Sequence, residues 1–229
     1  MDSKISVYGE ERLSVPAESG GLAVFRRWAF SSAFPEDGRI DYLAGSVETD
    51  LTPEDLQTHG TVKAAIAAEL HVLVVGRDLG QVFIDRARVS SKVADLSAEP
   101  DVVVVLWESL ETRRVRYVPR AGGEPGRFAE IEGGPDLVVE IVSDSSVAKD
   151  TERLPLLYAL AGVRELWLVD ARGREPELTV HSREDGTYRE VPPDAQGWRR
   201  SQVLALSCRL VRHPTRLSTW RYELEHSPS

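Results

Sequence analysis

The stretch Gly133–Asp150 (GGPDLVVEIVSDSSVAKD) decides the fold class of this chain. It opens with the turn-forming residues Gly-Gly-Pro and continues as an apolar run, Leu137–Val142, that contains a single acid, Glu140. Such a run is typical of a strand that is covered on both faces of a sheet. Because side chains alternate along a strand, we expect Asp136 and Glu140 on one face and Leu137 on the other.

Downstream of this strand, the pattern predicts a loop, a helix and a second strand. Residues 143–148 are polar and predict the loop. The helix is expected from about Asp150 or Thr151 to Ala161, with Gly162 as its stop. Arg164–Asp170 (RELWLVD) then predicts a strand, and short strands separated by turns follow.

Upstream, the clearest helix signal is Thr52-Pro53-Glu54-Asp55, which offers an N-cap residue, a proline at the first helical position and acids in the first turn. We expect this helix to run to Val75. The other elements predicted upstream are strands over Gln81–Asp85 and Asp101–Trp107, a short helix over 22–33, and a hairpin of 40–43 with 46–51.

These elements predict an α/β fold with a mixed central β-sheet flanked by helices and a β-rich C-terminal tail. We expect residues 1–21 to be a loose leader and residues 22–229 to form a single domain. Its core would span about 40–170 and its β-rich extension about 175–225. The length of 229 residues suits one such domain.

Composition points to a globular protein of the cytoplasm. Hydrophobic residues make up 41% of the chain and charged residues 28%, which argues against disorder. The longest apolar runs are too short to cross a bilayer, and no signal-peptide core follows Met1, so we expect no membrane association. The single cysteine, Cys208, excludes an internal disulfide framework and a cysteine-based zinc site and favours a reducing compartment.

The charge balance, with 37 acidic and 28 basic residues and a net charge of -9, is opposite to that of a protein that holds nucleic acid by bulk charge. The protein would have to bind nucleic acid through metal ions and local basic stretches. An exposed, solvated face is the more ordinary interpretation of each stretch. The candidate stretches are Arg113, Arg114, Arg116 and Arg120, and the pair Arg199 and Arg200.

The common phosphate-loop, dinucleotide, HExxH and GxSxG motifs are absent, so the candidate chemistry rests on carboxylates in buried strands. Glu140 needs a partner because burying a lone charge is expensive; a metal ion, a basic side chain and hydrogen bonds are the three candidates. Asp101 opens a neighbouring predicted strand, although it also suits a turn, as Asp136 does. Two carboxylates from adjacent strands would suit Mg²⁺.

Two further residues fit a phosphodiester-cleaving site. Lys149 follows Glu140 in the loop or the first turn of the next helix, where a cation would orient a water or steady developing charge. His59 lies near the start of the long helix and could act as a base or donate to a phosphate. An exposed surface residue is the more ordinary interpretation of each.

Several segments, taken in order, resemble the Uma-type restriction endonuclease family, part of the PD-(D/E)XK nuclease superfamily. The resemblance covers about residues 20–170. It implies a restriction-endonuclease-like core and metal-dependent hydrolysis of nucleic acid, with DNA as the favoured substrate, and it suggests a homodimer. The segments are RIDYLAGSVETDLTPEDLQTHGTV (39–62), GQVFIDRARV (80–89), AEPDVVVV (98–105), GGPDLVVEIVSDSSVAKD (133–150) and LYALAGVRELWLVD (157–170).

The resemblance also implies a set of site residues. Asp101 and Glu140 match the two motif acids and would hold Mg²⁺ or Mn²⁺ together with the backbone carbonyl of Ile141. The superfamily's lysine position is Val142 here, and the displaced position used in this family is Leu154. Lys149 or Arg153 would have to replace that lysine, and Lys149 is our catalytic candidate. Asp85 and Glu48, with His59, are weaker supporting candidates.

The missing lysine leaves a second interpretation open, a catalytically inactive nuclease fold that serves in binding or assembly. Failure of Lys149 to reach Glu140, or pairing of Glu140 with an arginine in a dry site, would favour it. A small-molecule hydrolase is the third interpretation, and it lacks a nucleophile motif.

Overall fold

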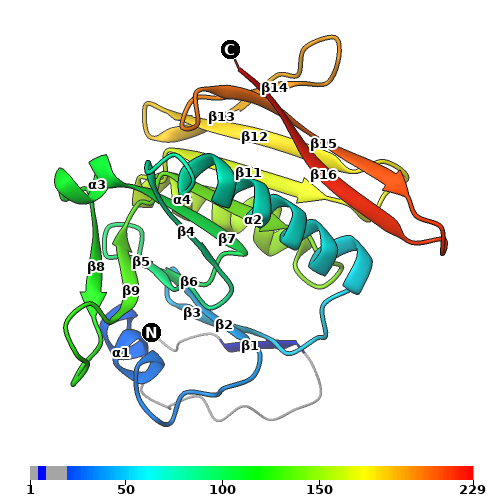
Figure 1. Cartoon of the computed structure of the whole chain (residues 1–229). Helices are drawn as coiled ribbons and strands as arrows, with labels where there is room; N and C mark the ends of the chain where they lie inside the picture. The colour runs from blue at the N-terminus through cyan, green and yellow to red at the C-terminus, as the bar shows by residue number, and fades with distance from the viewer. Residues whose placement is uncertain (1–4, 9–19, 229) are drawn as a thin grey trace.

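The computed structural model describes residues 5–8 and 20–228, which form three β-sheets with four α-helices packed on them (Figure 1). The central sheet has six strands in the order β13-β12-β11-β10-β7-β4. It is mixed, as predicted, because β10 and β11 run parallel and the other neighbours antiparallel. Its strands are β4 (Gly80–Ile84), β7 (Val102–Leu106), β10 (Leu137–Ile141), β11 (Glu165–Asp170), β12 (Glu177–Glu184) and β13 (Thr187–Val191).

A second sheet has seven strands in the order β1-β3-β2-β6-β5-β9-β8. The predicted hairpin of β2 and β3 is present, and it turns at Ala44 and Gly45, whose φ angles of 47° and 90° suit a two-residue turn. Strands β5 and β6 escaped prediction because each has only three residues. The strands are β1 (Ile5–Tyr8), β2 (Arg39–Leu43), β3 (Ser46–Asp50), β5 (Val89–Ser91), β6 (Leu96–Ala98), β8 (Val115–Pro119) and β9 (Phe128–Gly133).

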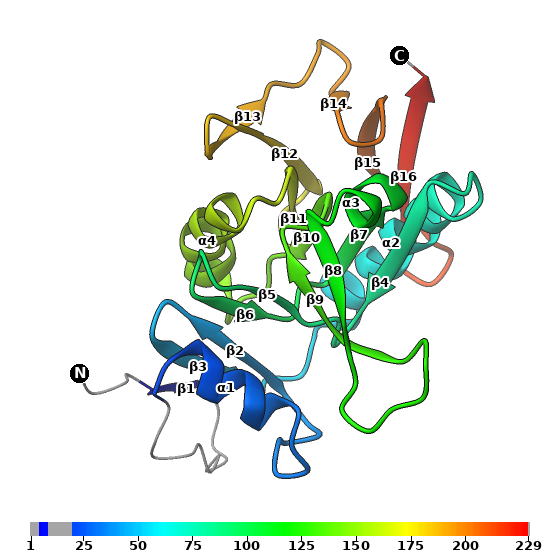
Figure 2. The ribbon, with the colours of Figure 1, turned by 90° about the vertical axis from the view of Figure 1, so that its left-hand side faces the viewer.

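The β-rich tail forms a third, antiparallel sheet of β14 (Arg199–Ser201), β15 (Leu206–Pro214) and β16 (Trp220–Pro228). Helices α2 and α4 lie on opposite sides of the central sheet (Figure 2), and β16 packs on α2. The helices are α1 (Leu22–Ala29), α2 (Thr61–Val74), α3 (Trp107–Glu111) and α4 (Leu154–Ala161).

Strand β10 is buried on both faces, as its apolar run predicts. Leu137, Val139 and Ile141 belong to the core shared with α2 and the third sheet. Val138 belongs to the core on the other face, which includes Tyr158 of α4. Burial of these fully enclosed aliphatic side chains contributes roughly 1.5–3 kcal/mol each. The alternation therefore directs Glu140 toward the side of the sheet that α4 covers.

The long helix begins later than predicted. Its N-cap is Asp55 instead of Thr52, because the Asp55 carboxylate accepts hydrogen bonds from the backbone N–H groups of Gln57 and Thr58. A π-type turn over Leu56–Gly60 then leads directly into α2. Glu54 consequently lies in the loop before the helix.

Most of the predicted leader, residues 1–21, lies outside the described residues. Within it, Ile5–Tyr8 forms β1, which pairs in parallel with β3. In the described part of the chain, every helix is too short or too polar to span a membrane.

Candidate active site

Asp101 and Glu140 lie beside each other on adjacent antiparallel strands. Asp101 immediately precedes β7, Glu140 is the fourth residue of β10, and both are buried. The backbone N–H of Ile141 donates to Oδ2 of Asp101 at 2.7 Å, so the backbone that carries Glu140 touches Asp101. Tyr158 of α4 donates its hydroxyl to Oε1 of Glu140 at 2.6 Å.

One guanidinium joins the two acids. Nη2 of Arg39, at the start of β2, lies 2.7 Å from Oδ1 of Asp101, and Nη1 lies 3.9 Å from Oε2 of Glu140. Both carboxylates therefore face the same side of the sheet and share one positive charge.

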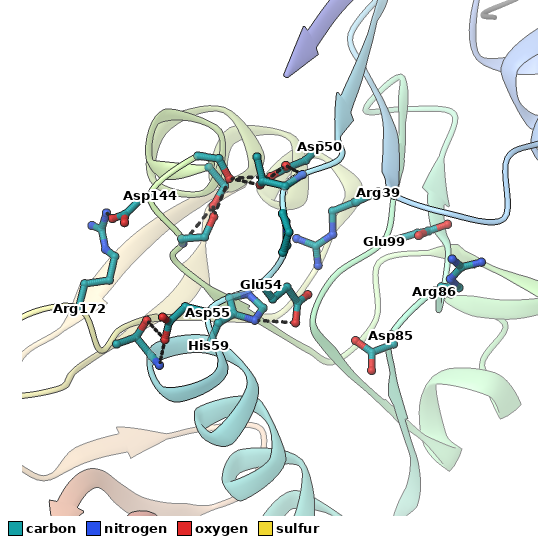
Figure 3. A pocket seen from close by; sticks show the side chains of 17 residues that line it. Arg39, Asp50, Glu54, Asp55, His59, Asp85, Arg86, Glu99, Asp144 and Arg172 are labelled. Atoms are coloured by element: carbon teal, nitrogen blue, oxygen red, sulfur yellow. Dashed lines mark hydrogen bonds and ion pairs between the residues drawn. The ribbon is translucent and has the colours of Figure 1, made fainter. Parts of the chain in front are cut away.

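A cavity of about 630 Å³ opens beside this pair (Figure 3). Arg39 and His59 line it, whereas Asp101 and Glu140 lie behind them. Asp85 and Arg86 stand on one side of the cavity, and Asp144 and Arg172 stand on the opposite side. A substrate in the cavity would therefore meet Arg39 and His59 before it met the two buried acids.

His59 is a buried cation, so its interpretation as an exposed surface histidine was wrong. Its Nε2 lies 3.5 Å from Oδ2 of Asp101, and its Nδ1 lies 3.1 Å from Oε2 of Glu54. Burial alone would lower the pKa of His59, but these two carboxylates outweigh burial and raise the pKa to about 9. At neutral pH the imidazole is therefore protonated.

The two strand carboxyls differ in charge. Burial opposes ionisation of Asp101, but Arg39 and His59 hold its pKa well below the usual range. Burial raises the pKa of Glu140 to about 8; Arg39 opposes this shift and the charge of Asp101 adds to it. Asp101 is thus ionised at neutral pH while Glu140 retains a proton. Oε2 of Glu140 is buried and has no hydrogen-bond partner within the described residues.

Glu54, His59 and Asp101 form a group that can hold a metal ion. One ligand atom from each lies within 4.8 Å of the others. The group does not identify the ion. His59 would have to release its proton before it could serve as a ligand, because only the neutral imidazole coordinates a metal.

Lys149 belongs to a neighbouring buried cluster and is not an exposed lysine. Its Nζ lies 3.2 Å from Oδ2 of Asp41 and 4.0 Å from Oδ1 of Asp150. Among the described side chains, no ion pair joins Lys149 to Glu140. Arg153, the other substitute for the missing lysine, pairs with Glu48 instead.

Asp85 lies at the rim of the cavity, just after β4, and is exposed. Its Oδ1 lies 2.7 Å from Nζ of Lys63, which in turn lies 3.8 Å from Oδ1 of Asp101. Asp85 is therefore linked to Asp101 through a lysine.

The predicted basic stretches are partly consumed by ion pairs. Arg114 pairs with Asp136, Arg116 with Glu132, and Arg199 with Glu190. Arg113, Arg120 and Arg200 are exposed and make no ion pair with any other described residue.

Arg39, Asp41 and Lys63 belong to the site, and sequence reasoning missed them. Asp41 carried a usable signal, because an acid between Ile40 and Tyr42 in an apolar strand raises the same question as Glu140. Lys63 lies one helical turn after His59 and shares its face. Arg39 had no local signal, since its contact with Asp101 joins residues 62 positions apart.

The comparisons with known proteins agree with this architecture. A family described as "Uma2: Putative restriction endonuclease" matches residues 22–213. A crystal structure described as a putative nuclease of the group DUF820, from Anabaena variabilis ATCC 29413, superposes with a TM-score of 0.59 at 19% sequence identity. The match covers 81% of this chain and 90% of that one, and it supports the predicted fold class. No curated protein matches the chain.

Proposed function

The chain belongs to the Uma2 restriction endonuclease family, and we propose that it is a metal-dependent nuclease that hydrolyses phosphodiester bonds in DNA. The observation that carries this proposal is the shared guanidinium of Arg39. Arg39 contacts both Asp101 and Glu140, and the backbone N–H of Ile141 donates to Asp101, so the two carboxylates belong to one cluster around a single positive charge.

We assign Mg²⁺ or Mn²⁺ to Asp101, Glu140 and the backbone carbonyl of Ile141. The donors fit such an ion because all are oxygens, and because Oε2 of Glu140 is buried with no hydrogen-bond partner in the described chain. When bound, the ion would polarise a phosphoryl oxygen and lower the pKa of a coordinated water. Glu140 would give up its proton and its contact with Arg39 on binding it.

The residues that face the cavity would bind and orient the phosphodiester. Arg39 and His59 are both positively charged and line the cavity, so they are placed to hold a phosphate and to steady the charge that develops on it. Lys149 would orient the attacking water only after leaving Asp41, which holds its ammonium at 3.2 Å. We therefore assign the contact with phosphate to Arg39 and not to Lys149.

An inactive binding or assembly module is the second candidate, and specific observations favour it. The resemblance puts Leu154 at the position of the family's lysine. Lys149 pairs with Asp41, and Arg39 already supplies a cation to the buried acids. These are the features expected of a nuclease fold that has lost its chemistry.

Nicking of supercoiled plasmid DNA with Mg²⁺ or Mn²⁺ separates the two candidates. We expect wild-type protein to nick the plasmid and Asp101→Asn and Glu140→Gln to lose at least about a hundredfold in rate, because each removes a charged metal ligand. Asp185→Asn, an exposed acid in the β12–β13 turn, is the control that keeps wild-type rates. Full activity in both site variants would refute the metal site, and absence of nicking by folded wild-type protein would favour the second candidate.

A further inference from the structure

A second cavity, of about 390 Å³, lies next to the first, and Arg86 lines both. Its volume falls in the range of roughly 300–1,000 Å³ that is usual for small-molecule sites. Its walls come from β4, β8 and β9, which contribute Phe83, Tyr117 and Phe128. The nuclease site proposed above uses none of these three rings.

The three aromatic rings form one continuous group. The ring centroids of Phe83 and Tyr117 are 5.7 Å apart, and those of Tyr117 and Phe128 are 5.3 Å apart. The hydroxyl of Tyr117 donates to Oε1 of Gln81 at 2.8 Å, which fixes the central ring. Phe128 is 52% exposed, so the group offers an aromatic surface that a planar ligand can reach from solvent.

Around this aromatic group, three arginines that form no ion pair with any described residue stand against one such acid, Glu124, although the chain as a whole is acidic. Arg86 is exposed and forms no ion pair with any described residue. The same holds for Arg120 and Arg127, which flank the loop that projects from the molecule between β8 and β9 (Figures 1 and 2). Glu130, the acid that lines this cavity, is neutralised by Arg26.

We propose that the second cavity binds an unpaired base of a DNA strand, with Arg86 on the phosphate that leads from this base to the catalytic cavity. The inference rests on the proposed function and narrows its substrate to DNA with single-stranded segments. Aromatic side chains stack on the flat faces of bases, and a guanidinium binds phosphate oxygens. Within a duplex, neighbouring pairs cover both faces of every internal base, so Phe128 can stack inside a strand only on an unpaired base.

Binding measured without metal tests this proposal independently of catalysis. In EDTA and low salt, fluorescence anisotropy would compare a short fluorescein-labelled DNA strand with the duplex of the same sequence. We expect the single strand to bind at least about fivefold more tightly, because stacking of one base is worth that much or more. Equal or tighter binding of the duplex would overturn the proposal, as would absence of binding.

Substitutions locate the binding in this cavity. Phe128→Ala should weaken single-strand binding at least about fivefold and Phe128→Trp should retain it, since the indole also stacks. Phe30→Ala, which removes a ring of similar exposure (42%) outside the cavity, should have no effect. A Phe128→Ala loss no larger than that of Phe30→Ala would overturn the assignment.

The arginine has its own matched pair. Arg86→Gln should weaken single-strand binding and reduce its salt dependence, whereas Arg77→Gln, an exposed arginine outside both cavities, should change neither. An RNA strand of the same sequence that binds wild-type protein more tightly than the DNA strand, and loses that affinity in Phe128→Ala, would overturn the choice of DNA. Phe128-dependent binding without plasmid nicking would support the base-binding site and count against the nuclease. Plasmid nicking without Phe128-dependent binding would support the nuclease and overturn the base-binding site.

Discussion

Asp136 immediately precedes β10 and Glu140 lies four residues further along, and both are buried, yet their hydrogen bonds differ. Asp136 accepts from the Ser109 hydroxyl, the backbone N–H of Leu106, Arg114 and Arg164. Glu140 accepts one hydrogen bond, from Tyr158, and its other oxygen has none within the described residues. Burial is therefore common to both acids, and unused acceptor capacity distinguishes the candidate functional one.

Glu165, on β11, shows the same rule. This buried carboxylate accepts hydrogen bonds from Ser201, Trp167 and the backbone N–H groups of Gln202 and Val203. Its acceptors are filled without any cation, and it ties the third sheet to the central one. Asp136 and Glu165 thus hold elements together, whereas one oxygen of Glu140 accepts no hydrogen bond from the described residues.

The largest expected effect on stability follows from removing Asp136, whose carboxylate oxygens all accept hydrogen bonds. Asp136→Ala should lower the free energy of unfolding by about 2–5 kcal/mol, because it leaves the Ser109 hydroxyl and the Leu106 backbone N–H without their acceptor. Glu140→Gln should instead raise it at neutral pH, since folding of wild-type protein must put a proton back on Glu140 and glutamine removes that cost. Urea unfolding in EDTA measures both, and similar losses in the two variants would contradict the comparison.

The next effect concerns the cation that the two site acids share. Arg39→Gln should lower the free energy of unfolding in EDTA by about 2–3 kcal/mol, because Asp101 loses a charged donor. Saturating Mn²⁺ should restore most of this loss, since the ion would replace the guanidinium. Arg77→Gln serves as the control for an exposed arginine. The idea fails if Mn²⁺ stabilises neither Arg39→Gln nor wild-type protein.

The pH dependence of stability should report the proton on Glu140. Its pKa is about 8 in the folded chain and near 4.5 in the unfolded chain, so between these values the folded state holds a proton that the unfolded state has released. Stability is therefore full below the lower value and falls as the pH rises toward 8, by up to about 1.4 kcal/mol per pH unit.

Glu140→Gln removes this contribution and should flatten the profile between pH 5 and 8 in EDTA. The raised pKa values of Asp150 and His59 act in the same direction and remain in the variant, so some slope persists. Identical profiles for the two proteins would show that Glu140 is ionised throughout this range.

The smallest effect is that of the single hydrogen bond to Glu140. Tyr158→Phe should cost about 1 kcal/mol, because Oε1 then loses its donor as well. Tyr222→Phe is the matched control, since the buried Tyr222 hydroxyl has no hydrogen-bond partner in the described part of the chain. Equal values of the unfolding free energy for the two variants would count against a structural role for the Tyr158 hydroxyl.

The sequence predicted the framework because strands leave a periodic signal. The apolar run around Glu140 predicted a doubly covered strand, and the placement of Asp101 beside it followed from adjacent strands. The predicted start of the long helix was wrong because Thr52 and Asp55 are both suitable N-cap residues. Only the backbone geometry selects Asp55. Arg39 could not be predicted, since it meets Asp101 through the packing of one sheet on another.

The guanidinium of Arg39 also allows the chain to fold without a bound metal ion. Many metal centres gather acids that repel one another until the ion arrives, so their chains unfold when a chelator removes it. Here the chain supplies its own counter-charge at Asp101, and newly synthesised protein would reach its final shape in a cell starved of divalent ions. Scarcity of the ion would then silence any hydrolysis while leaving the population of folded molecules intact.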